Sequence, residues 1–194
     1  MGATGGDPRG SEGSAGRNGE ADFDFHLGTW RTHVARLLHP LSGRDEWAEY
    51  EGTSVVRRVW GTGASVFELD VHGPAGRIEG VGLRLYNPHS HQWSLNWASR
   101  RVGTVDPPMV GEFRDGIGAF YGSEAVDGRV VLARNRFLEI APDSSCFEPA
   151  YSADGGETWE TNWVMRFTRT DVPRVAPERA ERNRDGERGD GSAR

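Results

Sequence analysis

Apolar side chains recur at every second position over most of this chain, and this period constrains the fold more than any other feature. In residues 93–97, Trp or Leu alternates with Ser or Asn. In residues 81–85 the apolar members are Val81, Leu83 and Leu85. A period of two is typical of half-buried strands, whereas an amphipathic helix needs a period near 3.6. The sequence therefore predicts two strands here whose apolar faces are buried.

Similar runs continue along the chain, and Gly-rich turns separate them. They span 29–38, 46–60, 64–72, 109–114, 117–125, 129–140 and 145–152. A further run, the last strand of the chain, is expected to hold on one face Trp159, Thr161, Trp163, Met165 and Phe167. Roughly eight to ten antiparallel strands with hardly a helix predict an all-β fold, a single up-and-down β-barrel. A sandwich is the other way to protect the edges of such a meander.

The strand-forming residues lie in one central segment. Residues 22–169 hold every Trp, Tyr and Phe of the chain, which predicts one domain of that extent. The flanking segments 1–21 and 170–194 are polar and lack an apolar period, so they bury too little surface to offset the entropy of ordering. We expect both to be disordered tails.

Composition excludes several classes of function. No apolar run is long enough for a membrane helix or a secretory signal, which favours a cytoplasmic protein without a membrane partner. The single cysteine, Cys146, rules out a disulfide framework and a multi-thiolate metal site. A net charge of -6 and the absence of lysine argue against a nucleic-acid partner. The oligomeric state does not follow from the sequence.

The segment from Asp22 to Trp30 has a short apolar stretch, a glycine and then a tryptophan that opens the first strand. Before an all-β meander, this Gly28-x-Trp30 pattern resembles the first-strand signature of the calycins, which include the lipocalins and the fatty-acid-binding proteins. The resemblance implies that Trp30 plugs the closed end of a barrel beneath an arginine of the last strand, Arg166 or Arg169.

Four segments in order resemble the DUF1579 family of bacterial proteins. They are the entry segment 22–30, Leu83 to Trp97, Asp106 to Phe113, and Ser152 to Trp163. The sequence departs from the family pattern at Phe147 and Pro149, in the strand before the last. The resemblance implies a calycin-like barrel but no agreed activity.

The last of these segments also contains Ser152-x-Asp154-x-Gly156-x-Thr158-Trp159, which looks like the Asp-box hairpin of sialidase propellers. There the motif is a folding device, because the carboxylate bonds turn amides and the Trp packs under the turn. A single box does not make a propeller, whose blades repeat. We therefore expect Asp154 to be structural.

Strand alternation selects the side chains that could line the barrel. If Trp30 faces inward, then so does Arg36. Arg134 and Arg136 share a face of one strand, so they either reach the interior or form a surface pair with Glu148 or Glu160. The expected ligand-binding residues are Trp30, Arg36, Trp93, Trp97, Arg134, Arg136 and Trp163. They would bind a small, largely apolar ligand that carries an acidic or aromatic group.

Two other functions stay open. The first is a lipocalin-like enzyme of secondary metabolism, a cyclase or an isomerase, with Tyr121 and Glu148 as general acid and base in the cavity. The second is a nitrobindin-like haem protein, which would need His33 or His72 as axial ligand. Alternation places His33 opposite Trp30 and His72 at a turn. We therefore expect no haem, no other cofactor and no metal site.

Overall fold

The computed structural model describes residues 18–170, which form eleven strands and one short 3₁₀ helix. The elements are η1 (Asp24–His26), β1 (Gly28–Leu37), β2 (Trp47–Arg58), β3 (Ala64–Gly73), β4 (Gly76–Asn87), β5 (Gln92–Ser99), β6 (Met109–Arg114), β7 (Ile117–Val126), β8 (Arg129–Leu138), β9 (Ser144–Ser152), β10 (Glu160–Thr161) and β11 (Trp163–Arg169). The predicted strand ranges agree with these bounds to within a few residues.

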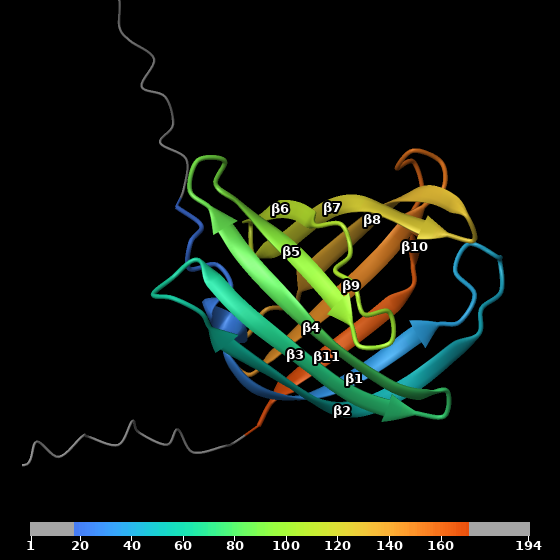
Figure 1. Ribbon diagram of the computed structural model, residues 1–194, viewed down its shortest axis with the longest axis horizontal. Coiled ribbons are helices and arrows are strands. Elements are labelled where there is room, and N and C mark those ends of the chain that lie inside the picture. Colours follow the sequence, from blue (N-terminus) through green and yellow to red (C-terminus); the bar gives the residue numbers. More distant parts are fainter. Residues whose placement is uncertain (1–17, 171–194) are drawn as a thin grey trace, which may run out of the picture.

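The strands close into a barrel (Figure 1). From β1 to β9 each strand pairs antiparallel with the next, and β11 pairs with both β9 and β1. This makes a ten-stranded barrel, and β10 adds a short pairing on β9. The predicted all-β, up-and-down barrel is therefore confirmed. Closure leaves only the ends of the barrel as routes to its interior.

The predicted tails fall mostly outside the described residues. Residues 1–17 of the N-terminal arm and 171–194 of the C-terminal tail are not described, so their disorder stays a prediction. The described part of the arm packs on the barrel: the indole N–H of Trp93 donates to the Gly19 carbonyl over 3.0 Å. The packed chain thus begins before residue 22.

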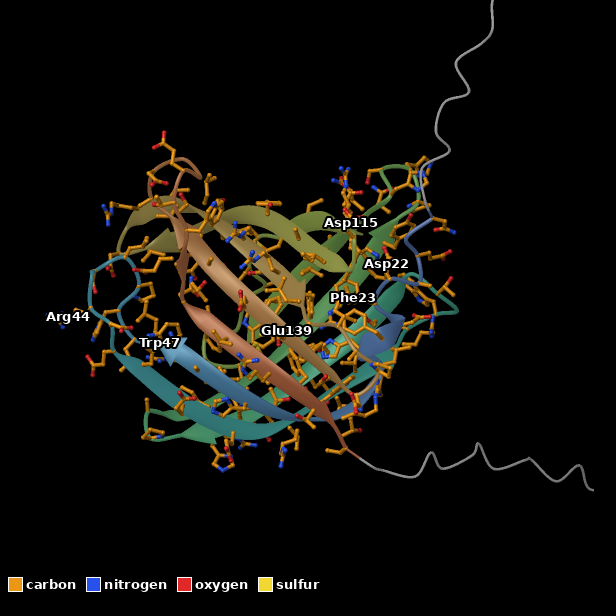
Figure 2. All side chains as sticks on the ribbon, turned by 180° about the vertical axis from the view of Figure 1, so that it is seen from behind. Asp22, Phe23, Arg44, Trp47, Asp115 and Glu139 are labelled. Atoms are coloured by element: carbon orange, nitrogen blue, oxygen red, sulfur yellow. The ribbon has the colours of Figure 1, made fainter. Side chains whose placement is uncertain are left out.

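The two ends of the barrel differ. At one end, here called the closed end, η1 lies across the opening where β1 begins. At the other, the open end, loops 38–46 and 100–108 connect the strands. Figure 2 shows Phe23 at the closed end and Trp47 at the open end.

A tryptophan and an arginine fix η1 in place. Trp30 is fully buried, and its indole N–H donates to the His26 carbonyl over 2.8 Å. The Arg169 guanidinium lies 4.1 Å from the centre of the Trp30 ring and donates to the carbonyls of Phe25 and Leu27. The predicted plug is confirmed, and its arginine is Arg169. Arg166 lies on the outer face instead.

The apolar face predicted for residues 81–85 points outward, which corrects the sequence prediction. Val81 and Leu83 are 46% and 37% exposed, whereas Gly80, Gly82 and Arg84 face the interior. The reason is space for aromatic rings: a Cβ on Gly80 would lie 2.2 Å from the Trp97 ring. Aromatic rings from neighbouring strands occupy the space above the inward face of β4, so this face is glycine-rich.

The last predicted strand also breaks its alternation. Thr161 lies opposite Ala150, but Met165 lies opposite Phe147, so Asn162 is an extra residue between β10 and β11. Such a bulge reverses the faces on either side of it. Trp163, Met165 and Phe167 therefore face inward, and the prediction that Trp159 and Thr161 share this face is wrong.

The turn that resembles an Asp box is a structural device, as predicted. The Asp154 carboxylate accepts the backbone N–H of Thr158 over 3.0 Å, and the Trp159 indole donates to the Gly156 carbonyl over 3.1 Å. Hydrogen bonds from Thr158 lower the pKa of Asp154. The carboxylate is thus occupied by its own turn.

Candidate functional site

The two halves of the barrel interior are filled to different degrees. In the closed half the inward side chains are buried aromatic rings that contact one another, among them Phe23, Phe113, Phe120 and Phe137. In the open half Tyr50 and Val71 are buried, but several other inward side chains are only partly buried and remain accessible to solvent. We define the mouth cluster as Arg36, Ile78, Trp97, Glu124, Tyr151 and Trp163. This cluster is the candidate site.

Arg36 supplies the cation of the mouth cluster. It faces inward because it lies six residues after Trp30 on β1, and its register partner on β11 is Trp163. The guanidinium lies 5.2 Å from the centre of the Trp163 ring. Among the described residues it forms no ion pair and no hydrogen bond. A guanidinium that is held on an indole and lacks a carboxylate partner is suited to bind an anion.

Tyr151 of β9 and Glu124 of β7 also face the interior of the open half. Burial raises the pKa of Tyr151 to about 12; the charge of Glu124 acts in the same direction and that of Arg36 opposes it. Burial also raises the pKa of Glu124, with a further contribution from Asp106. All three groups belong to the open half, and the charges of Glu124 and Arg36 both act on Tyr151. Tyr151 remains a hydrogen-bond donor, and Glu124 holds its proton more firmly than an exposed glutamate does.

Three of the predicted ligand-binding residues face the interior of the open half, namely Arg36, Trp97 and Trp163, and Arg36 contacts Trp163. Two others, Trp30 and Trp93, are buried in the closed half with exposed fractions of 0% and 2%. Their indole N–H groups are bonded to backbone carbonyls. Trp30 and Trp93 are therefore part of the buried core.

The remaining four predicted residues lie on the outer face. This corrects the interior place predicted for Tyr121 and Glu148; for Arg134 and Arg136 the structure has the surface alternative and not the interior one. Glu148 accepts from Arg136 over 3.0 Å as a cross-strand pair, and Arg134 lies 4.4 Å from the centre of the Trp159 ring. Tyr121 is 53% exposed. The physical reason is that Phe120 and Phe137 take the inward positions of β7 and β8, which leaves the alternate positions outside.

Four polar residues that face inward were missed. For Glu124 and Tyr151 the signal was present, since each lies four residues after a Phe on the same strand face. Arg84 was missed because the leucines and valine beside it suggested the opposite orientation. His26 precedes the first strand, where alternation gives no information.

The two histidines considered for haem lie on the outer face. His33 pairs with Glu49 over 2.7 Å, which confirms its place opposite Trp30, and His72 is exposed. Within residues 18–170, no three His, Cys, Asp or Glu side chains are grouped so as to hold a metal ion. In the same part of the chain, no helix has the length and apolar character needed to cross a bilayer.

Comparisons with known proteins give information on the fold only. No protein-family model and no curated protein matches the chain. The S-type phycobiliprotein lyase CPES from Guillardia theta is similar in structure, with a TM-score of 0.57, 13% identity, and coverage of 81% of this chain and 95% of the lyase. The redesigned β-barrel mFAP0 bound to DFHBI has a TM-score of 0.43 and 9% identity, and covers 75% of this chain and 99% of that barrel. The lyase supports the barrel assignment.

Proposed function

We propose that this protein binds a small, largely apolar ligand that carries an acidic group, and that the ligand lies in the open half of the barrel. The observation that carries the proposal is Arg36, a partly buried cation that faces the interior without a carboxylate partner among residues 18–170. Trp163 beside it and Trp97 of the same half provide apolar walls. An anion on Arg36 would form a charge-assisted hydrogen bond while its apolar body covers the indoles.

We also propose that the chain belongs to the DUF1579 family and acts in the cytoplasm without a nucleic-acid partner. The four ordered segments of the sequence support the family. The net charge of -6 and the lack of lysine support the absence of a nucleic-acid partner.

The test is a titration of intrinsic Trp fluorescence with 1-naphthylacetate and with the uncharged 1-naphthylethanol. We expect saturable quenching by the carboxylate and weaker binding of the alcohol. In Arg36→Met the carboxylate should lose about tenfold in affinity or more, which corresponds to about 1.4 kcal/mol, and the alcohol should be unaffected.

Three matched variants serve as controls. Arg31→Met removes an exposed arginine from the outer face of the same strand, and Tyr121→Phe and Glu148→Gln alter other outer positions. All three should bind as the wild type does. Absence of saturable quenching by either ligand would refute the binding function, and equal affinities in the wild type and Arg36→Met would refute the role of Arg36.

The pair Glu124 and Tyr151 favours an enzyme as the second candidate. The predicted acid and base, Tyr121 and Glu148, lie outside the barrel, whereas Glu124 and Tyr151 face its interior. We propose that Glu124 removes a proton from the carbon next to a substrate carbonyl and that Tyr151 donates to the enolate oxygen. Return of the proton to a different carbon would complete an isomerisation.

Proton exchange tests this candidate without knowledge of the substrate. The α-protons of phenylpyruvate should exchange with D₂O faster in the presence of the protein, as followed by NMR. Glu124→Gln should abolish the acceleration, and Glu148→Gln should preserve it. An exchange rate equal to that of buffer alone would leave the barrel a binding protein.

A further inference from the structure

An arginine is buried in the closed half and has no polar partner in the described part of the chain. Arg84 is 5% exposed, and its guanidinium carbon lies 4.5 Å, 5.2 Å and 5.3 Å from the ring centres of Phe23, Phe67 and Phe137. Its Nη1 is buried and has no hydrogen-bond partner among the described residues. Burial lowers the pKa of Arg84 to about 9, so the guanidinium remains charged at neutral pH. Aromatic faces attract this cation but accept few of its N–H bonds.

A histidine with the same deficiency lies beside it. His26 is fully buried, and neither ring nitrogen has a hydrogen-bond partner among residues 18–170. Its ring centre is 5.9 Å from that of Phe67 and 5.7 Å from that of Phe137, the rings that Arg84 also contacts. Each tautomer of a neutral imidazole still has one N–H to donate. Three buried nitrogen atoms therefore lie around one pair of phenylalanine rings.

The charge around these nitrogens is positive. Burial lowers the pKa of His26 well below its usual range, and the charges of Arg84 and Arg169 lower it further. Arg169 donates its N–H groups to the carbonyls of Phe25, Leu27 and Pro142. Within the described part of the chain, no carboxylate forms an ion pair with Arg84 or Arg169. A buried charge is normally paired with an opposite charge. Without such a pair, its burial lowers the stability of the folded state.

We propose that the closed half binds one small monoanion, a halide or a carboxylate of the size of formate, between Nη1 of Arg84 and a ring N–H of His26. The anion would accept a hydrogen bond from each of the two unpaired donors and would neutralise the charge of the buried guanidinium. The edges of aromatic rings carry partial positive charge, which suits an anion between Phe67 and Phe137. Close packing of these rings restricts the site to small ions. The site is separate from the mouth cluster and stands whether or not the open half binds a ligand.

The test measures thermal unfolding at constant ionic strength while sodium chloride replaces sodium gluconate, whose anion is too large for the site. The midpoint of the wild type should rise by several degrees and then saturate, because an anion that binds only the folded state stabilises it. Formate should act in the same way. In Arg84→Met the anion-specific rise should disappear, and in Arg136→Met, which alters an outer arginine, it should persist.

A second measurement uses only the wild type, since Arg84→Met alters the core. Binding of chloride should broaden its ³⁵Cl NMR line in proportion to the protein, and formate should reverse the broadening. Equal midpoints in chloride and gluconate would overturn the proposal. So would an anion-specific rise that persists in Arg84→Met, or a crystal structure grown in chloride that shows only water at the two donors.

Discussion

Arg36 and Arg84 both face the barrel interior, and their surroundings give them different energies. Arg36 is partly exposed, so its guanidinium keeps part of its hydration. Arg84 is 5% exposed and has no carboxylate partner within residues 18–170. Burial of an unpaired ion costs several kcal/mol, whereas a desolvated cation–π contact returns about 2 kcal/mol. The contribution of Arg84 to stability therefore does not explain why an arginine occupies this buried position.

Replacement of Arg84 tests this balance. In gluconate, where the proposed anion is absent, Arg84→Met should raise the free energy of unfolding by about 1–3 kcal/mol, because an apolar chain of similar length replaces an unpaired charge. Urea denaturation measures the difference. Arg31→Met on the outer face should change stability by less than about 0.5 kcal/mol. A loss of stability in Arg84→Met would mean that the cation–π contacts outweigh the burial cost.

His26 gives the protein a pH dependence of known sign. Its pKa in the folded state lies well below 6.5, owing first to burial and then to Arg84 and Arg169. Below pH 6.5 the unfolded chain therefore binds a proton that the folded protein does not, and stability falls as the pH falls. The slope is at most about 1.4 kcal/mol per pH unit.

Urea denaturation between pH 6.5 and 5 isolates this effect, since the depressed pKa values of Asp70 and Asp154 act at lower pH. In His26→Phe the loss of stability over this interval should be smaller than in the wild type by about 1–2 kcal/mol. Identical slopes in the two proteins would contradict the buried neutral imidazole.

At the scale of elements, η1 depends on the last strand. Three amino acids long, it is too short to be stable alone, and Arg169 of β11 donates to the carbonyls of Phe25 within it and Leu27 directly after it. Arg169 also covers Trp30. The closure of this end of the barrel is thus held by a contact between the first and last segments of the domain.

Loss of that contact should be costly. Arg169→Met removes three charge-assisted hydrogen bonds and should lower the free energy of unfolding by about 2–4 kcal/mol, as measured by urea denaturation. Arg166→Met removes an exposed pair with Glu139 on the outer face of the same strand, and should cost less than about 1 kcal/mol. Equal losses in the two variants would show that Arg169 does not hold η1.

The sequence predicts strand positions well and strand faces less well. Alternation located each strand, and Trp30 and Arg36 face inward as expected. The face of β4 was wrong because its inward positions are Gly80 and Gly82, which make room for rings from other strands. The faces of Trp159 and Thr161 were wrong because the bulge at Asn162 leaves no mark in the apolar pattern. Both errors come from packing between strands that are distant in the sequence.

The same limits apply to the site. Arg36, Trp97 and Trp163 were found because each lies on a strand with an unbroken alternation from a buried residue. Tyr121 and Glu148 were chosen for their chemistry, and each lies one position away from an inward one. A register error of one residue exchanges the interior for the surface.

On the scale of the whole molecule, the barrel divides its interior between stability and access. The closed half is filled by aromatic contacts that join η1 and Phe23, the residue before it, to β3, β6, β7 and β8. The open half has partly exposed tryptophans, a tyrosine and an arginine. Because the strands close on themselves, a ligand reaches the open half only between the loops at that end.

The most direct test of this division is the response of the indole N–H resonances in a ¹H–¹⁵N NMR spectrum to 1-naphthylacetate. We expect the signals of Trp97 and Trp163 to shift in a saturable way, because these rings line the open half. The signals of Trp47 and Trp60, which are 36% and 76% exposed outside it, should stay in place. Shifts confined to Trp47 and Trp60, or no shift at any indole, would contradict a ligand site inside the barrel.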